Sequence, residues 1–177
     1  ENCPQFSDQV PFIQQVFAAY KNRKEQGNLL DYDDLLTFWL EVLKEHPAVR
    51  KTYGEQFQYI LVDEYQDTNR LQFELIRALG SGRRNILAVG DDAQSIYGFR
   101  GADVRNLLQF PEVFPGAAVY RLETNYRSTP EILRLANTSI GFNTNQFPKE
   151  LKSVQGPGSL PVVVPLADAR QQAAFIA

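Results

Sequence analysis

The sequence predicts an α/β fold: a parallel sheet flanked by helices, with a helical segment before it. Two observations support this fold class. Short apolar runs alternate with segments whose apolar residues recur at helical spacing, as in repeated βαβ units. The first 56 residues contain helical patterns only. The length of 177 residues suits one domain, or one and a part. A compact chain of this length buries roughly 70% of its unfolded surface.

Two amphipathic helices are expected in the N-terminal segment. The first begins after Ser7 or Asp8 and is expected to stop at Gly27, after a charged run. Its apolar face consists of Val10, Ile13, Val16, Phe17 and Tyr20. The second lies within residues 29–47 and begins near three aspartates, which favour capping and the helix dipole. Its apolar face consists of Leu35, Leu36, Trp39, Val42 and Leu43.

Strands of the buried type are expected in the rest of the chain. Apolar runs rich in Ile, Val and Leu predict them at 57–62, 85–89, 119–122 and 161–166. Pro165 favours an edge or strand-end position for the last of them. Helices between the strands would make the crossover connections of a parallel sheet.

Helices are expected between and after these strands. The first is expected to be capped by Thr68 or Asp67 and to end at Gly80. A second is expected near 103–110, and a third begins at Ser128–Glu131, which has the form of a capping box. A last helical pattern runs to the C-terminus without a stop signal.

Bulk properties exclude several classes of protein. The net charge of −3 and the pI of about 5.2 do not indicate nucleic-acid binding, so any such contact must come from a local groove. The single cysteine rules out an internal disulfide and fits a reducing, cytoplasmic location. No apolar run is long enough for a membrane span, and the first ten residues lack the basic and apolar regions of a signal peptide. The absence of methionine and the unterminated last helix predict a fragment of a longer protein.

Three of the expected strands each end in a polar cluster. The clusters are Asp63–Glu64, Asp91–Gln94, and Glu123 followed by Asn125–Arg127. Asp63 and Asp91 lie 28 residues apart, and Asp91 and Glu123 lie 32 apart, each about one βαβ repeat. Because ligands bind outside the carboxyl ends of parallel strands, all three clusters are expected at one rim.

These clusters suit a metal–nucleotide site. An apolar strand that ends in Asp-Glu is the Walker B arrangement, in which Asp63 would hold Mg²⁺ and Glu64 would activate water. The Gln94 amide can bond a γ-phosphate oxygen or the attacking water, and Arg127 can stabilise the transferring phosphoryl group. Each feature also has a purely structural alternative. Asp63–Glu64 could be a simple exit from the strand into a turn, Gln94 could be a turn residue, and Arg127 could form a surface salt bridge with Glu123 or Glu131.

The segment after Gln94 places Tyr97, Phe99 and Arg100 between two glycines. Aromatic rings beside a guanidinium are what stacking onto unpaired bases requires. The alternative, that both rings pack inside the fold, is slightly favoured by the residues alone.

Three motifs together carry a family resemblance. VDEYQDTN, VGDDAQSIYGFRGAD and LETNYRST, in this order and spacing, resemble motifs II, III and IV of UvrD/Rep-type superfamily 1 DNA helicases. The similarity extends upstream through LDYDDLL and downstream through ANTSIGFN, so it covers most of the chain.

The resemblance implies a RecA-like motor of the P-loop NTPase type, with Mg-ATP bound between two motor domains and DNA crossing them. Residues 1–56 would then be part of an inserted helical subdomain and the return into the first motor domain, 57–116 the core of that domain, and 117–177 the start of the second. Single-stranded and partly duplex DNA would be the substrates, movement would run 3′ to 5′, and the setting would be repair or replication.

The resemblance also implies roles for single residues. Asp63 would bind Mg²⁺, Glu64 would activate water, and Gln94 would sense the γ-phosphate. Arg127 would reach across from the second motor domain, and Tyr126 would stack near the adenine. The residues expected along the single strand are Tyr97, Phe99 and Arg100, with Phe99 as the stacking ring.

The chain also departs from the family pattern. It contains no G-x-x-x-x-G-K-[ST] motif, so the phosphate cradle and its lysine are missing. Ala93 and Phe99 are milder departures, at positions where relatives often have an acidic residue and Trp. We therefore expect the chain alone to be inactive as an ATPase and helicase, and its longer parent to be active.

Two other functions remain open from sequence. A metal-dependent nuclease or phosphohydrolase would use Asp63, Glu64, Asp67 and Asp91 around two metals. That interpretation leaves Gln94, Arg127 and the aromatic segment unexplained. The other is a non-catalytic relative that binds DNA or protein.

Overall fold

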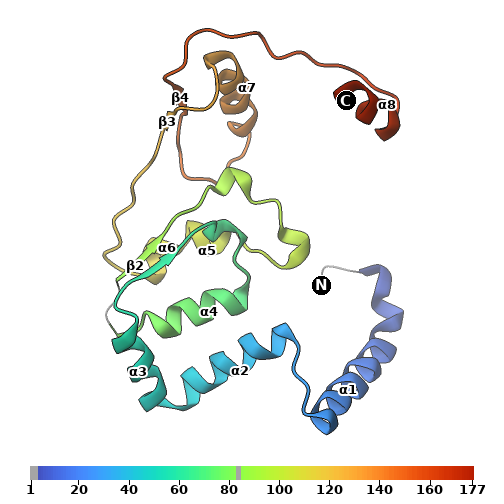
Figure 1. Ribbon diagram of the computed structural model, residues 1–177, viewed down its shortest axis with the longest axis vertical. Helices are drawn as coiled ribbons and strands as arrows, with labels where there is room; N and C mark the ends of the chain where they lie inside the picture. The colour runs from blue at the N-terminus through green and yellow to red at the C-terminus, as the bar shows by residue number, and fades with distance from the viewer. Residues whose placement is uncertain (1–3, 83–84) are drawn as a thin grey trace.

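The computed structural model describes residues 4–82 and 85–177 (Figure 1). The N-terminal segment is helical, as expected. A 3₁₀ turn, η1 (Pro4–Gln9), leads into α1 (Val10–Gly27), and α2 (Tyr32–Glu45) and α3 (Pro47–Gln56) follow. Helix α1 ends at Gly27, as expected, and the charged run before Gly27 forms its last turns. The left-handed residue after that helix is Asn28, at φ 49°.

The start of α2 confirms the expected cap. Asp31 accepts a hydrogen bond from the Asp34 backbone N–H, and the Asp34 carboxylate accepts one from the Asp31 N–H, both at 2.9 Å. Lys24 of α1 donates to both carboxylates, at 2.7 and 2.6 Å. This cluster fixes the turn between α1 and α2. Helix α3 was missed by the sequence analysis, because Pro47 occupies the first turn of a helix instead of ending one.

The best-packed core lies between α2 and α4 (Arg70–Leu79). Its buried members are Leu40, Leu43 and Leu75. The predicted apolar face of α2 is therefore rotated: Leu35 and Val42 are exposed, and Leu40 takes an inner position. Figure 1 shows α1 and the C-terminal α8 (Ala169–Ile176) standing apart from this core.

The first two expected strands pair in parallel, but each is short. β1 (Ile60–Val62) lies beside β2 (Ile86–Ala88), with Ile60 opposite Ile86. Leu61 and Leu87 are exposed, so one face of this two-stranded sheet is open. The expectation of fully buried strands is wrong on this face.

The rest of the chain corrects two strand predictions. Residues 119–122 and 161–166 are not strands. The next strand is β3 (Thr124–Asn125), which pairs in parallel with β4 (Lys152–Ser153) in a separate small sheet. Helix α7 (Pro130–Ile140) packs beside that sheet (Figure 1). Within residues 4–82 and 85–177, the strands therefore form two separate small sheets and not one continuous sheet.

Helix boundaries after β1 also differ from expectation. Asn69 caps α4, and short 3₁₀ turns η2 (Tyr65–Asp67), η3 (Asp92–Gln94) and η4 (Gly98–Arg100) follow the strand ends. The helix expected near 103–110 is two short pieces, α5 (Arg105–Leu108) and α6 (Phe110–Val113). At α7 the expected capping box is absent: its N-cap Thr129 makes no side-chain cap, and the Glu131 carboxylate accepts from the Gly158 N–H instead.

The result is a mixed arrangement of helices and short parallel sheets behind a helical N-terminus. Within the part of the chain that the structure describes, no helix combines the length and the apolar character needed to cross a membrane.

Candidate functional site

The two parallel strands bring two of the three predicted polar clusters to one rim. The Val89 N–H donates to the Val62 carbonyl at 2.8 Å, and the Tyr65 N–H donates to the Val89 carbonyl at 2.9 Å. The parallel ladder thus continues into both strand exits. Asp63 and Glu64 leave β1 beside Gly90 and Asp91, which leave β2.

Asp63 and Glu64 form a tight, hydrogen-bonded exit from β1. The Glu64 N–H donates to Asp63 Oδ1 at 2.9 Å, and both side chains are exposed. Glu64 has a left-handed backbone, with φ 50° and ψ 43°. That conformation costs a non-glycine residue roughly 1–2 kcal/mol. Such strain is concentrated at functional sites, which supports this turn as the centre of the site.

Gln66 joins the two strand exits. Gln66 is 1% exposed; its Nε2 donates to Glu64 Oε2 at 2.7 Å, and its Oε1 accepts from the Asp91 N–H at 3.0 Å. A Cβ added at Gly90 would lie 2.7 Å from Gln66 Oε1. Glycine at that position therefore leaves room for the link. The sequence analysis missed Gln66 because nothing in its local pattern marks a glutamine as buried.

Asp91 and Gln94 form the second half of the rim. Gln94 Nε2 donates to Asp91 Oδ2 at 2.7 Å, and the Ala93 N–H donates to Asp91 Oδ1 at 3.1 Å. Burial alone would raise the pKa of Asp91, but hydrogen bonds from Lys149 and Gln94 outweigh it and hold the pKa below its usual value. Asp91 therefore stays charged. Because it accepts a hydrogen bond from Gln94 Nε2, it fixes the orientation of the Gln94 amide.

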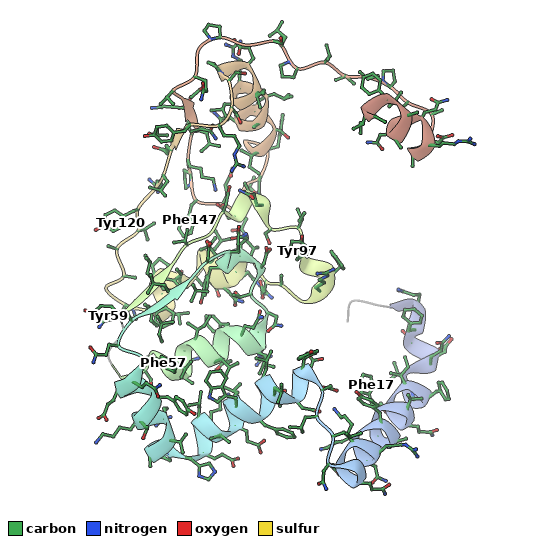
Figure 2. All side chains as sticks on the ribbon, viewed as in Figure 1. Phe17, Phe57, Tyr59, Tyr97, Tyr120 and Phe147 are labelled. Atoms are coloured by element: carbon green, nitrogen blue, oxygen red, sulfur yellow. The ribbon has the colours of Figure 1, made fainter. Side chains whose placement is uncertain are left out.

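Lys149 also reaches this rim, from the segment that follows α7. Its Nζ lies 2.6 Å from Asp91 Oδ1 and 2.5 Å from Asp92 Oδ1. The Phe147 N–H donates to Asp92 Oδ2 at 3.0 Å. Figure 2 shows Phe147 where the chain returning from α7 approaches the end of β2. A lysine 58 residues from Asp91 gives no local signal, so the sequence analysis did not find it.

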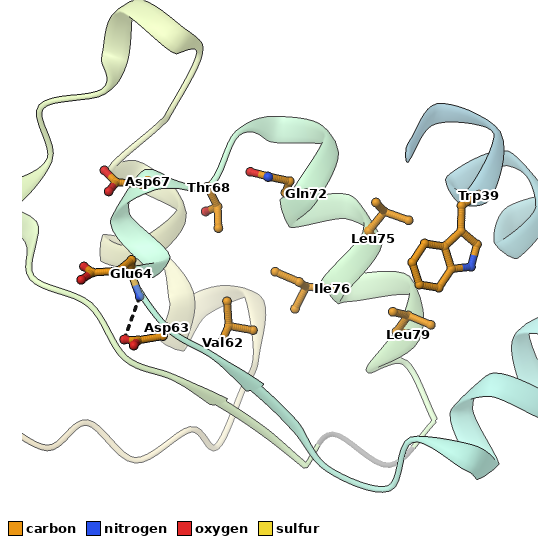
Figure 3. A pocket seen from close by; sticks show the side chains of 10 residues that line it. All are labelled: Trp39, Val62, Asp63, Glu64, Asp67, Thr68, Gln72, Leu75, Ile76 and Leu79. Carbon is orange, nitrogen blue, oxygen red and sulfur yellow. Dashed lines mark hydrogen bonds between the residues drawn. The ribbon is translucent and has the colours of Figure 1, made fainter. Parts of the chain in front are cut away.

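A cavity of about 430 Å³ opens beside Asp63 and Glu64 (Figure 3). Its polar end consists of carboxylates and a hydroxyl; its other end is an apolar wall that includes Trp39. The polar lining residues are Asp63, Glu64, Asp67, Thr68 and Gln72. Trp39 was not among the site residues predicted from sequence, and Asp67 was named only as a metal ligand of the nuclease alternative.

The carboxylates at this cavity fit a hard cation. Asp67 Oδ1 is buried and has no hydrogen-bond partner among the described residues, so it is a free acceptor beside Asp63 and Glu64. No cage of three or more ligating side chains exists in the ranges 4–82 and 85–177. Mg²⁺ suits such a site, because it keeps several waters and takes only one or two carboxylates together with substrate phosphates.

The aromatic segment lies on a loop beyond the rim. The Tyr97 and Phe99 ring centroids are 6.0 Å apart, and the Arg100 guanidinium lies 5.4 Å from each ring. Phe99 is 79% exposed, so the alternative in which both rings pack inside the fold is wrong. Figure 2 shows Tyr97 on this outlying loop. An exposed ring held by a cation is available for stacking.

The third predicted cluster lies elsewhere. Arg127 and Tyr126 follow β3, and the β3–β4 pair stands away from β1 and β2 (Figure 1). Both side chains are exposed, and the loop is held by Asn125 Oδ1, which accepts from the Arg127 and Ser128 N–H groups at 2.9 and 2.7 Å. The expectation that all three clusters share one rim is wrong, because β3 pairs with β4 and not with β1 or β2.

Comparison with known proteins decides the family. Residues 3–115, more than half of the chain, match the family described as UvrD/REP helicase N-terminal domain. The chain belongs to this family. The resemblance inferred from its three motifs is confirmed.

Named relatives agree. The chain is 45% identical over 146 residues to "ATP-dependent DNA helicase PcrA" of Bacillus subtilis, covering 82% of this chain and 20% of that protein. It is 41% identical over 162 residues to "DNA helicase II" of Rickettsia typhi, covering 92% of this chain and 25% of that protein. The chain therefore spans about a fifth to a quarter of the length of these relatives.

Proposed function

We propose that the protein containing this chain is an ATP-dependent DNA helicase that couples Mg-ATP hydrolysis to movement on single-stranded DNA. One observation carries the proposal: Glu64, in its left-handed turn, is joined through Gln66 to the Asp91–Gln94 exit of the adjacent parallel strand. A water-activating carboxylate and a phosphate-sensing amide are thus held in one network. The names of the relatives supply the rest of the argument.

The roles follow from the chemistry of each side chain. We propose that Asp63 holds Mg²⁺, directly or through water, and that Glu64 orients and deprotonates the attacking water. Bound Mg²⁺ would neutralise charge on the phosphates. Gln94 would contact the γ-phosphate or the water. The exposed Tyr97, Phe99 and Arg100 would carry single-stranded DNA, with Phe99 as the stacking ring.

Arg127 and Tyr126 belong to the second half of the ATP site in this proposal. We propose that residues 57–116 form the core of a RecA-like motor domain, with 1–56 as part of a helical insertion, and that 117–177 begin a second motor domain. Arg127 would then reach the phosphates, and Tyr126 the adenine, when the two parts close on nucleotide. The separation of β3–β4 from β1–β2 is consistent with two parts that move relative to each other.

The wider setting follows from the family and not from single residues. We propose movement in the 3′ to 5′ direction, partly duplex DNA as the unwinding substrate, and a role in repair or replication. A cytoplasmic location fits the single cysteine.

Glu64→Gln in the full-length protein tests the catalytic proposal. We expect the DNA-stimulated kcat for ATP to fall at least about 100-fold, because the amide cannot accept the proton of water. ATP affinity should stay within about threefold, since the side-chain volume is kept. Steady-state ATPase assays and equilibrium nucleotide binding measure both.

Glu55→Gln is the matched control, since Glu55 is an exposed glutamate of α3 paired with Lys51. It should leave the kcat unchanged. A wild-type protein without DNA-stimulated ATPase activity would contradict the proposed function, and an active Glu64→Gln variant would contradict the role of Glu64.

The nuclease alternative receives less support from the geometry. Asp91, one of its proposed ligands, is already bound by Lys149 and Gln94, and its carboxylate faces a cation of the protein's own chain. Metal-dependent cleavage of DNA in the absence of ATP would favour that alternative. DNA binding without ATP hydrolysis would favour a non-catalytic relative.

A further inference from the structure

We propose that Lys149 is a positioning residue that couples the segment after α7 to the ATP site, by holding Asp91 and thereby fixing the amide of Gln94. The inference rests on the proposed function, because it assigns the coupling between two parts of the same motor. Lys149 would not touch the reacting atoms itself.

Lys149 is built into the rim and is not a loose surface pair. Its side chain is only 17% exposed, and it contacts Asp91 and Asp92 at 2.6 and 2.5 Å. Asp92 is 3% exposed on its side chain and also accepts the Phe147 N–H at 3.0 Å. One short segment, 147–149, therefore engages both carboxylates through a backbone donor and a cation. Exposed ion pairs lack this combination of burial and multiple bonds.

The two carboxylates of Asp91 and Asp92 need a cation such as Lys149 beside them. Asp91 and Asp92 are adjacent carboxylates, and two such charges in a partly buried rim disfavour each other. Burial alone would lower the pKa of Lys149, but the bonds to Asp91 and Asp92 outweigh it and raise the pKa above its usual value. The amine therefore stays charged at neutral pH. Without it, Asp92 would be a buried charge with no cation beside it among the described residues.

The consequence reaches Gln94 through a short path. Lys149 binds Asp91 Oδ1, and Asp91 Oδ2 accepts from Gln94 Nε2 at 2.7 Å. This bond occupies one N–H of the amide and fixes which end of the group is the donor. The Asp91 N–H in turn donates to Gln66, which binds Glu64. A movement of segment 147–149 would therefore shift the sensor and disturb the water-activating carboxylate together.

The contacts of Lys149 also connect the β3–β4 sheet to the β1–β2 sheet. Lys149 lies three residues before β4, whose partner β3 is followed by Tyr126 and Arg127. The Glu150 N–H donates to Glu123 Oε1 at 2.8 Å, just before β3. The hydrogen bond from the Glu150 backbone to the Glu123 side chain thus links the second sheet to the residue next to Lys149. Lys149 carries a displacement of that sheet to Asp91.

Steady-state kinetics of the full-length protein test the proposal. Lys149→Met removes the charge and keeps the length of the side chain. We expect the DNA-stimulated kcat for ATP to fall about tenfold, with KM for ATP within about twofold, because a coupling interaction is lost and not a binding one. Lys149→Arg should recover activity to within about threefold, since it restores the cation. Lys152→Met, an exposed lysine of β4, is the control and should match wild type.

A double-mutant cycle tests whether Lys149 acts through Asp91. Asp91→Asn alone should lower kcat about tenfold as well, and it provides the measurement if Lys149→Met does not fold. The double variant should be no slower than either single one, because both break the same path. A roughly hundredfold, multiplicative loss would overturn the proposal, as would wild-type kcat in Lys149→Met or in Asp91→Asn. An inactive wild-type protein would instead contradict the proposed function.

Discussion

Glu64 and its neighbours show how local constraints build the rim. The left-handed turn at Glu64 places the next residue, Tyr65, inside the fold and leaves Asp63 and Glu64 outside. Tyr65 is fully buried and meets Phe110 edge to face, with ring centroids 5.4 Å apart. The turn therefore depends on an aromatic anchor directly beside the proposed catalytic residue.

Tyr65→Phe is expected to stabilise the chain. The Tyr65 hydroxyl has no hydrogen-bond partner among the described residues, and an unsatisfied buried polar group costs about 1–3 kcal/mol. We expect a gain of about 1 kcal/mol in the free energy of unfolding at pH 7, by urea denaturation. Tyr120→Phe, at an exposed position, should change little. A loss of stability in Tyr65→Phe would show that the hydroxyl is bound.

The same variant has a pH signature. Burial raises the pKa of Tyr65 to about 12 from its usual value of 10.0. The neutral folded form is fully favoured below pH 10, and this contribution is lost as pH rises toward 12, where only the unfolded chain has already ionised. The advantage of Tyr65→Phe should therefore widen between pH 10 and pH 12.

At the scale of the element, the sequence predicts the presence of a helix better than it predicts the residue at which the helix begins. Asp31 caps α2 as expected. At α4 the expected caps were Thr68 or Asp67, but Asn69 takes the position. The reason is competition: Thr68 Oγ1 donates to the Tyr65 carbonyl at 2.7 Å, and the Thr68 carbonyl accepts from Asn106 at 2.9 Å. Tertiary contacts thus decide which of several suitable residues begins the helix.

Asn69→Ala should destabilise the chain by about 1 kcal/mol, because it removes one half of the capping box with Gln72. Urea denaturation followed by circular dichroism measures the change. His46→Ala is the comparison: His46 is the N-cap of α3 and makes no side-chain cap bond, so its replacement should cost less. Equal losses in the two variants would contradict a role for the Asn69 bond.

At the scale of the whole molecule, the chain is far more open than its length predicts. Its accessible surface is 14144 Å². A compact protein of this mass exposes about 8,700 Å². The buried fraction is therefore nearer half than the expected 70%. The open face of β1–β2 and the exposed apolar side of α1 account for part of this excess.

Such openness, with the absence of a phosphate-binding motif, predicts that the 177-residue chain alone does not hydrolyse ATP. Electrostatic stabilisation of phosphoryl transfer needs a water-excluded site, and the cavity beside Glu64 is open and partly walled by apolar side chains. We expect no release of phosphate above background from the purified chain, with or without single-stranded DNA. Robust ATPase activity of this chain would contradict that expectation.

The sequence by itself determined the local chemistry: two short parallel strands that end in Asp63–Glu64 and Asp91–Gln94, a capped α2, and a family resemblance that the family match confirms. These features depend on residues close in the chain, where spacing and residue type carry the information. Only the tertiary structure decided that β3 pairs with β4 and that Gln66 is buried. It also decided that Lys149 meets Asp91 and Asp92. Those contacts depend on which distant segments pack together, and nothing in the neighbourhood of a lysine encodes a carboxylate 58 residues away.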